Sequence, residues 1–206
     1  MAKRKRAARR KAAPRAVFSG RTLADNKSSR NTLLALIVIF TLLAFLIQAS
    51  IVAGAAVYWL LVICAVGFFL IEAYYRRDEP LMIGKAVFIG FFLAVFDFAF
   101  QNAGWLLGLW QTSGSILMMG AVPIEIVLIC FIGGTAWALY IPKKYNRFYT
   151  VMDVLVFAAY GALGEYLLIF AGLMSYHAWW NSWWAFAAYA CVWLVLHFVR
   201  YKVVKV

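Results

Sequence analysis

Three acidic residues stand where the chain is otherwise apolar, and they are the residues best suited to carry out chemistry. Asp97, Glu125 and Glu165 each lie inside a long hydrophobic stretch, and no Lys or Arg occurs within these stretches. An ionised carboxylate at the centre of a bilayer costs at least ~2.5–3.5 kcal/mol. We therefore expect these acids to be protonated or to meet polar groups in an internal cavity. A protonated carboxylic acid can deliver a proton and a neighbouring carboxylate can remove one, so the three acids predict proton-transfer chemistry.

Polar and aromatic side chains lie at a similar depth or just outside it, and together they predict a pocket that opens to the outer side. The residues expected to contact a substrate are Gln101, Asn102, Trp105, Trp110, His177 and Asn181. Pro123 lies two residues before Glu125, and a proline frees a backbone carbonyl and opens a kink. We expect no metal and no cofactor, because the three cysteines have no short metal-ligand spacing. Two further acids, Glu72 and Asp153, lie near predicted cytoplasmic ends, where water or a basic residue is in reach, and are interpreted as structural.

Part of this pattern resembles a known enzyme family. The resemblance covers about residues 53–141 and is carried by Asp97, Gly104, Trp105, Trp110, Gly120, Pro123-Ile124-Glu125 and Phe131. These residues resemble the integral-membrane lycopene cyclase domain of carotenoid biosynthesis. That family has an Asp and a Trp on one span and a Pro-X-Glu-Glu motif on the next. Ile126 replaces the second acid of the motif here, and the last two predicted spans contain no Pro-X-Glu.

The resemblance implies a cofactor-free isomerase that acts on a hydrophobic isoprenoid. A buried carboxylic acid protonates a polyene double bond, the carbocation cyclises, and a carboxylate removes a proton. Aromatic faces stabilise the cation. On this interpretation Glu125 is the expected proton donor, Asp97 is its partner or base, and Glu165 completes the pocket.

Two other functional classes fit the same residues. Six short-looped spans with an outward-facing polar and aromatic pocket also suit a small-molecule-binding transport component. Its energy would come from a partner or an ion gradient, because no Gly-rich ATP-binding loop occurs. The third class is a non-catalytic subunit of a membrane complex, in which the basic N-terminal tail docks to other membrane subunits.

The elements that must position these residues are membrane-spanning helices. Of the 206 residues, 66% are hydrophobic and 14% are charged, whereas about a quarter of a soluble domain is charged. A single globular core cannot bury this excess, so the lipid bilayer must solvate it. The sequence predicts an all-α transmembrane bundle. Polar interruptions and prolines divide residues 32–206 into six predicted spans, at about 32–50, 53–75, 86–110, 116–141, 148–174 and 182–200.

The basic residues predict the orientation. Lys and Arg gather in cytoplasmic segments of membrane proteins. All 20 fall in the N-terminal tail, at 76–85, at 143–147 or after 199, and the three alternate loops contain none. Both termini of this multi-pass cell-membrane protein are therefore expected in the cytoplasm. Eleven of the 20 lie in the first 30 residues, so the net charge of +12 indicates a basic tail rather than nucleic-acid binding. The tail, residues 1–31, is expected to be disordered and to bind anionic lipid headgroups.

The third and fifth predicted spans resemble each other. A shift of 68 residues superposes Asp97 on Glu165 and Ala103-Gly104 on Ala171-Gly172. This match predicts an internal duplication in which the two acids are equivalent.

Overall fold

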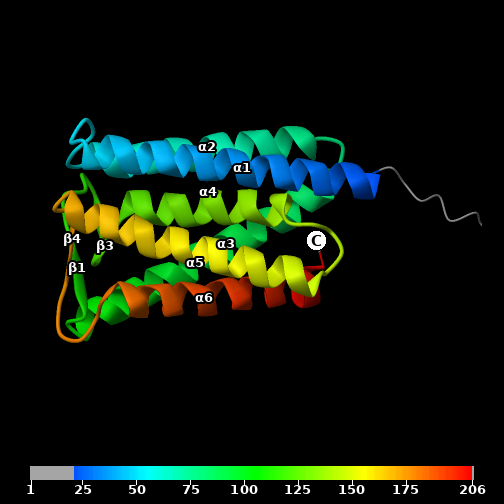
Figure 1. Ribbon diagram of the computed structural model, residues 1–206. Helices are drawn as coiled ribbons and strands as arrows, with labels where there is room; N and C mark the ends of the chain where they lie inside the picture. Colours follow the sequence, from blue (N-terminus) through cyan, green and yellow to red (C-terminus); the bar gives the residue numbers. More distant parts are fainter. Residues whose placement is uncertain (1–20, 206) are drawn as a thin grey trace, which may run out of the picture.

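Six α-helices run along one common direction in the computed structural model, which describes residues 21–205 (Figure 1). The helices are α1 (Arg21–Gln48), α2 (Ala56–Tyr75), α3 (Pro80–Leu106), α4 (Ile124–Tyr140), α5 (Arg147–Phe170) and α6 (Ser182–Phe198). A π-helical turn, η1 (Val199–Val204), continues α6. Four short strands lie between the helices: β1 (Trp110–Thr112), β2 (Met118–Met119), β3 (Val122–Pro123) and β4 (Met174–Tyr176).

The helices have the length and composition of membrane spans. Five apolar segments are long enough to cross a bilayer, namely Asn31–Gln48, Ala56–Tyr75, Pro80–Leu106, Arg147–Phe170 and Ser182–Val204. The sixth apolar helix, α4, has 17 residues and rises about 25 Å. Many large apolar side chains, such as Phe45, Leu81 and Trp183, are exposed on the bundle, as lipid contact requires. The protein is thus a helical bundle that fits a multi-pass membrane protein.

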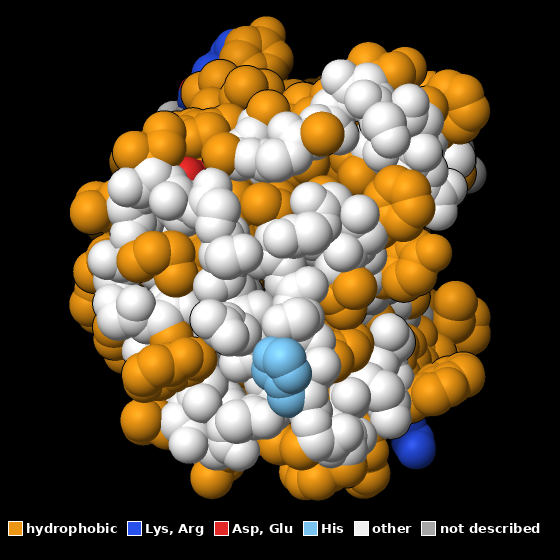
Figure 2. Space-filling view, turned by 90° about the vertical axis from the view of Figure 1, so that its left-hand side faces the viewer, with side chains coloured by type: hydrophobic (Ala, Val, Ile, Leu, Met, Phe, Trp, Pro, Cys, Tyr) orange, Lys and Arg blue, Asp and Glu red, His pale blue; other side chains and the backbone are white. Residues whose placement is uncertain are grey.

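The two ends of the bundle differ. Both ends of the described chain lie at one end, together with the α2–α3 and α4–α5 loops (Figure 1); we call this the terminal end. The four strands lie at the opposite end, the strand end. Uncharged polar and backbone atoms cover much of the middle of the strand end, with hydrophobic side chains around them (Figure 2). The loops at 49–55, 107–123 and 171–181 contain no Lys or Arg, whereas the loops of the terminal end do.

The helix α1 begins earlier than the first predicted span. It starts at Arg21, so it includes residues 21–31, which the sequence analysis assigned to a disordered tail. Neither Gly nor Pro occurs between residues 21 and 48, and their absence lets the helix continue beyond the apolar segment. Residues 1–20, which carry most of the predicted lipid-binding charge, lie outside the described part of the chain.

The helix α4 begins later than predicted. The fourth span was expected at 116–141, but residues 118–123 form a hairpin in which β2 pairs with β3. Gly120 turns this hairpin with a φ of +65°, a conformation that favours glycine. Pro123 precedes the first helical residue with a φ of −57° and a ψ of 133°. Glu125 therefore lies in the first turn of α4 and not in the middle of a span.

The helices α3 and α5 end with the same cap. Gly108 and Gly172 follow them with φ values of +65° and +71°. The amide of Leu109 donates to Gly104 O (2.9 Å) and that of Leu173 to Leu168 O (2.8 Å), which is the Schellman pattern. These caps stop the two helices four residues before the predicted ends at 110 and 174, and the chain continues into β1 and β4. The two strands pair antiparallel, with Trp110 opposite Tyr176.

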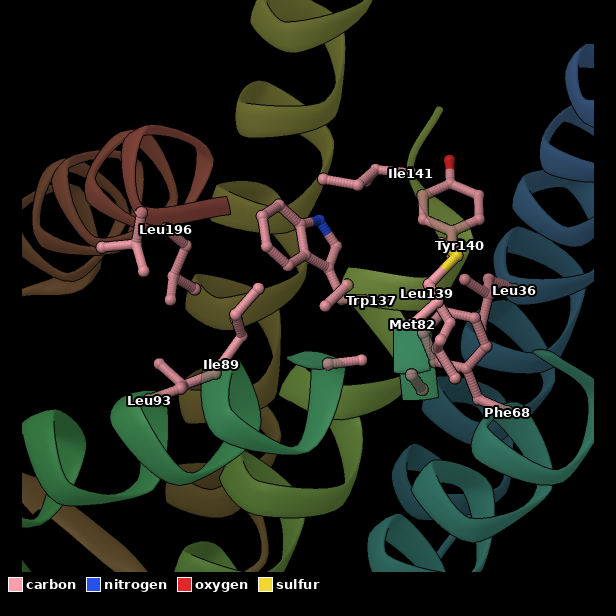
Figure 3. Packing of buried hydrophobic residues seen from close by; sticks show 14 residues of the cluster. Leu36, Phe68, Met82, Ile89, Leu93, Trp137, Leu139, Tyr140, Ile141 and Leu196 are labelled. Carbon is pink, nitrogen blue, oxygen red and sulfur yellow. The ribbon is translucent and has the colours of Figure 1, made fainter. Parts of the chain in front are cut away.

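Two apolar clusters hold the bundle together. The cluster near the terminal end surrounds Trp137 of α4, which is fully buried and points among Ile89 of α3 and Leu196 of α6 (Figure 3). The cluster near the strand end includes Trp110 and Tyr58. The Tyr58 hydroxyl donates to Ser113 O (3.0 Å) and lies 3.3 Å from Leu173 O. This contact ties α2 to both strand-bearing loops.

Candidate functional site

Two of the three predicted catalytic acids meet inside the bundle. Asp97 of α3 and Glu165 of α5 line one small cavity, with a volume of about 10 Å³, that also involves Gln101, Trp180 and Tyr189. A space of this size approaches the minimum that holds one water molecule. The structure therefore brings Asp97 and Glu165 together as neighbours across a helix interface.

The same two acids reach a much larger cavity. Its volume is about 760 Å³, and α1, α2, α4 and α5 supply most of its walls. On α2 the lining runs from Leu61 to Tyr75, which corresponds to a length of about 20 Å at helical rise. Most of the lining is aliphatic, aromatic or glycine. A volume of this order lies in the range of known small-molecule sites, ~300–1,000 Å³, and the shape suits an elongated apolar molecule.

Asp97 has polar neighbours but an incomplete set of hydrogen bonds. Gln101 and Cys130 are its neighbours on α3 and α4. The amide oxygen of Gln101 accepts a hydrogen bond from Trp110 Nε1 (2.8 Å), which leaves the amide nitrogen free to face the carboxyl group. Asp97 Oδ2 is buried and has no hydrogen-bond partner among the described residues. A buried acceptor without a partner is costly in a purely structural acid, and it indicates a position where another molecule can bind.

Glu165 has a different partner. Its side chain is buried, and its Oε2 accepts a hydrogen bond from the Tyr176 hydroxyl at 2.5 Å. Tyr176 belongs to β4, outside the spans. Burial and the neighbouring Glu165 raise the pKa of the Tyr176 phenol above its usual value. Tyr176 therefore stays protonated at neutral pH and acts as a donor to Glu165.

Glu125 lies apart from the other two acids. It is fully buried in the first turn of α4, and Ser115 Oγ donates to its Oε2 at 2.5 Å. Within residues 21–205 it lines neither cavity. A carboxylate at a helix N-terminus is favoured by the helix dipole. The expected pairing of Asp97 with Glu125 is thus not what the structure shows: the partner of Asp97 is Glu165.

We expect Glu125→Ala to destabilise the protein and Glu125→Gln to leave it nearly unchanged. Alanine strands the Ser115 hydroxyl in a buried site, at a cost of about 1–3 kcal/mol, whereas the glutamine amide oxygen can still accept its hydrogen bond. Thermal unfolding of the two variants in detergent compares them directly. A well-folded Glu125→Gln protein that has lost isoprenoid turnover would return Glu125 to the chemistry.

The six predicted substrate residues have separate roles. Only Gln101 lines the cavities, and the buried Trp110 holds it in place. Asn102 Oδ1 accepts from the amide of Ala121 (3.1 Å) and so anchors the β2–β3 hairpin. Asn181 caps α6 by accepting from the amide of Trp183 (2.9 Å). The remaining two, Trp105 and His177, are exposed.

The sequence analysis missed the tyrosines around Glu165. Tyr176 comes from a loop strand and Tyr189 from α6, so only the folded bundle brings them to the acid. Their one sequence signal is a hydroxyl group within or beside an apolar stretch, and the chain has 11 tyrosines. Nothing in the spacing distinguishes these two from the other nine.

A second buried polar cluster lies toward the terminal end. Asp153 was expected to reach water or a basic residue, but it is only 4% exposed. Its Oδ2 accepts from Trp137 Nε1 (2.8 Å) and lies 2.9 Å from His197 Nε2. The other structural acid, Glu72, accepts from Thr32 Oγ1 at 2.9 Å. Both acids are thus held by partners from neighbouring helices.

The chain has the parts of an acid–base site for an apolar substrate. Among the described residues, no group of three or more His, Cys, Asp or Glu side chains is arranged to hold a metal ion. Comparisons of the chain with protein-family models, with curated proteins and with solved structures find no match. The functional argument therefore depends on the geometry of Asp97, Glu165 and the large cavity.

Proposed function

We propose that this protein is a cell-membrane enzyme that binds an elongated isoprenoid and transfers protons to and from it through Asp97 and Glu165. The observation that carries this proposal is the cavity of about 760 Å³, whose mostly apolar walls are interrupted by these two neighbouring acids. An apolar chain fits the walls, and the acids meet it at one place. The unpaired Oδ2 of Asp97 supports a role in contact with the bound molecule.

The proposed reaction is a cofactor-free cyclisation. One acid, in its protonated form, gives its proton to a carbon–carbon double bond, and a second double bond of the same chain attacks the cation to close a ring. The other acid, as a carboxylate, then takes a proton from the adjacent carbon, so the product is an isomer of the substrate. Phe157, Tyr160 and Trp193 line the cavity, and their ring faces can stabilise the cation.

The proposed topology has six spans with both termini in the cytoplasm. The terminal end carries the basic loops, as cytoplasmic segments do, and the strand end carries none of the 20 Lys and Arg residues in its loops. On this assignment Glu165 and Tyr176 lie toward the outer side. Transport and a non-catalytic subunit role remain the alternative functions, and the ligand test below separates them.

The three native cysteines test ligand binding without any substitution. Cys64 and Cys130 line the large cavity, whereas Cys191 is exposed on α6. We expect lycopene in nanodiscs, at about ten times its Kd, to slow N-ethylmaleimide labelling of Cys64 and Cys130 about tenfold. Labelling of Cys191, measured by mass spectrometry in the same sample, serves as the control and should not change.

The outcomes of this labelling experiment discriminate between the three functions. No protection by lycopene, or equal slowing at all three cysteines, contradicts the isoprenoid site. Protection by a water-soluble compound would favour a transport component instead. Protection that depends only on a co-purifying protein would favour a subunit of a membrane complex.

A further inference from the structure

Gln101 and Glu165 occupy equivalent places in two similar halves of the site. Each lies five residues before the last residue of its helix, Leu106 in α3 and Phe170 in α5. The two helices end in the same cap, and each continues into a strand of the β1–β4 pair. The structural repeat therefore has an offset of 64 residues, and it matches Glu165 with Gln101.

The two equivalent residues accept hydrogen bonds from equivalent donors. Trp110 of β1 donates to Gln101, and Tyr176 of β4 donates to Glu165. Trp110 and Tyr176 are direct partners in the β1–β4 ladder. The arrangement is therefore the same twice, and only the chemistry of the groups differs.

This difference decides which half can pass a proton. An indole N–H and a primary amide hold their protons at neutral pH, so Trp110 and Gln101 can fix the position of Asp97 but cannot relay protons to it. A phenol both donates and accepts through one oxygen, and a carboxyl group exchanges its proton readily. The Tyr176–Glu165 pair can therefore conduct a proton, whereas the Trp110–Gln101 pair cannot.

Tyr176 also has access to water. Its side chain is half-buried in β4, and its chain neighbours Ser175 and His177 are exposed at the strand end. The other titratable groups near Glu165 are Asp97 from α3 and Tyr189 from α6. Tyr189 lines both cavities and lies seven residues into α6, about 10 Å from the strand end. Tyr176 is thus the phenol that bridges between Glu165 and the end of the bundle.

We propose that Tyr176 is a proton relay that connects Glu165 to water at the strand end, so that the cavity exchanges protons with this side. In one step a hydronium ion gives a proton to the Tyr176 oxygen while Tyr176 gives its own proton to the Glu165 carboxylate. Glu165 becomes neutral, Tyr176 is unchanged, and a water molecule remains; the reverse step discharges Glu165. The inference rests on the proposed function, because it names the route by which the proposed acid is recharged.

Hydrogen–deuterium exchange of the Glu165 carboxyl group tests the relay without any substrate. The carbonyl stretch of a protonated carboxyl group shifts in D₂O, and the Glu165 band is the one that disappears in Glu165→Gln. We expect Tyr176→Phe to slow the exchange of this band at least about tenfold. The matched control, Tyr189→Phe, removes the other phenol beside Glu165 and should exchange at the wild-type rate.

Each other outcome counts against the relay. Equal exchange rates in wild type and Tyr176→Phe would overturn it, as would a spectrum in which no protonated band depends on Glu165. If Tyr176→Phe does not fold, a fluorinated tyrosine at position 176 keeps the shape and the hydroxyl group but makes the phenol more acidic. It should change the exchange rate, and an unchanged rate again refutes the relay. The labelling of Cys64 and Cys130 tests isoprenoid binding separately, so the failure of one proposal is distinguishable from failure of the other.

Discussion

Turnover of lycopene in membranes is expected to fall at least ~100-fold in Glu165→Gln and in Asp97→Asn, while both proteins remain folded. Each substitution keeps the size of the side chain and removes the carboxyl group that gives or takes a proton, and general acid–base catalysis contributes ~10²–10⁴-fold. The two acids line the same small cavity, so the double variant should lose little more than either single variant. Product formation per amount of folded protein, followed by chromatography, measures the effect.

The control for this experiment is Asp78→Asn. Asp78 is exposed in the loop between α2 and α3, and the same chemical change there should leave turnover unchanged. A folded Glu165→Gln protein with wild-type turnover would remove Glu165 from the mechanism. Wild-type protein without any isoprenoid turnover, together with unprotected cysteines, would reject the enzyme proposal as a whole.

Replacement of Asp153 by alanine should produce the largest loss of stability. Asp153 holds Trp137 and His197 through one oxygen, and all three side chains are buried. Removal of one partner from a buried pair costs about 3–5 kcal/mol. For a chain of this length such a loss lowers the apparent unfolding temperature by roughly 6–20 °C.

Two further variants make this result specific. Asp153→Asn retains an oxygen that accepts from Trp137, so we expect a smaller loss than in Asp153→Ala. Asp78→Ala removes an exposed carboxylate and should change the unfolding temperature little, because surface substitutions typically stay within about 0.5 kcal/mol. Equal unfolding temperatures for wild type and Asp153→Ala would show that the Trp137–Asp153–His197 cluster does not hold α4, α5 and α6 together.

Local features of the sequence predicted the helices well. Apolar runs of the length of a bilayer predict helices because the backbone must satisfy its own hydrogen bonds in lipid, and the structure confirms a helical bundle with membrane-length apolar segments. The breaks at Ser50, at Pro80 and at Pro142 also lie between helices as expected. Helix ends were less predictable, because the Gly108 and Gly172 caps and the β2–β3 hairpin depend on backbone conformation that apolar composition does not reveal.

The partners of the acids were decided by tertiary structure alone. The sequence showed that Asp97, Glu125 and Glu165 stand in apolar surroundings, but their spacing suggested that Asp97 pairs with Glu125 across one loop. The hairpin before α4 places Glu125 in its first turn, and the packing of α3 against α5 and α6 brings Glu165 to Asp97 instead. Contacts of this kind join residues far apart in the chain, so no local spacing determines them.

The internal repeat shows the same division. A match of residue types suggested an offset of 68 residues, with Asp97 equivalent to Glu165, whereas the helix caps and the β1–β4 ladder give an offset of 64 and pair Glu165 with Gln101. Composition and charge determined by themselves that the chain is a helical membrane protein, because solvation by lipid acts on each segment separately. The positions of Tyr176 beside Glu165 and of His197 beside Asp153 required the tertiary structure, because they depend on how separate helices pack.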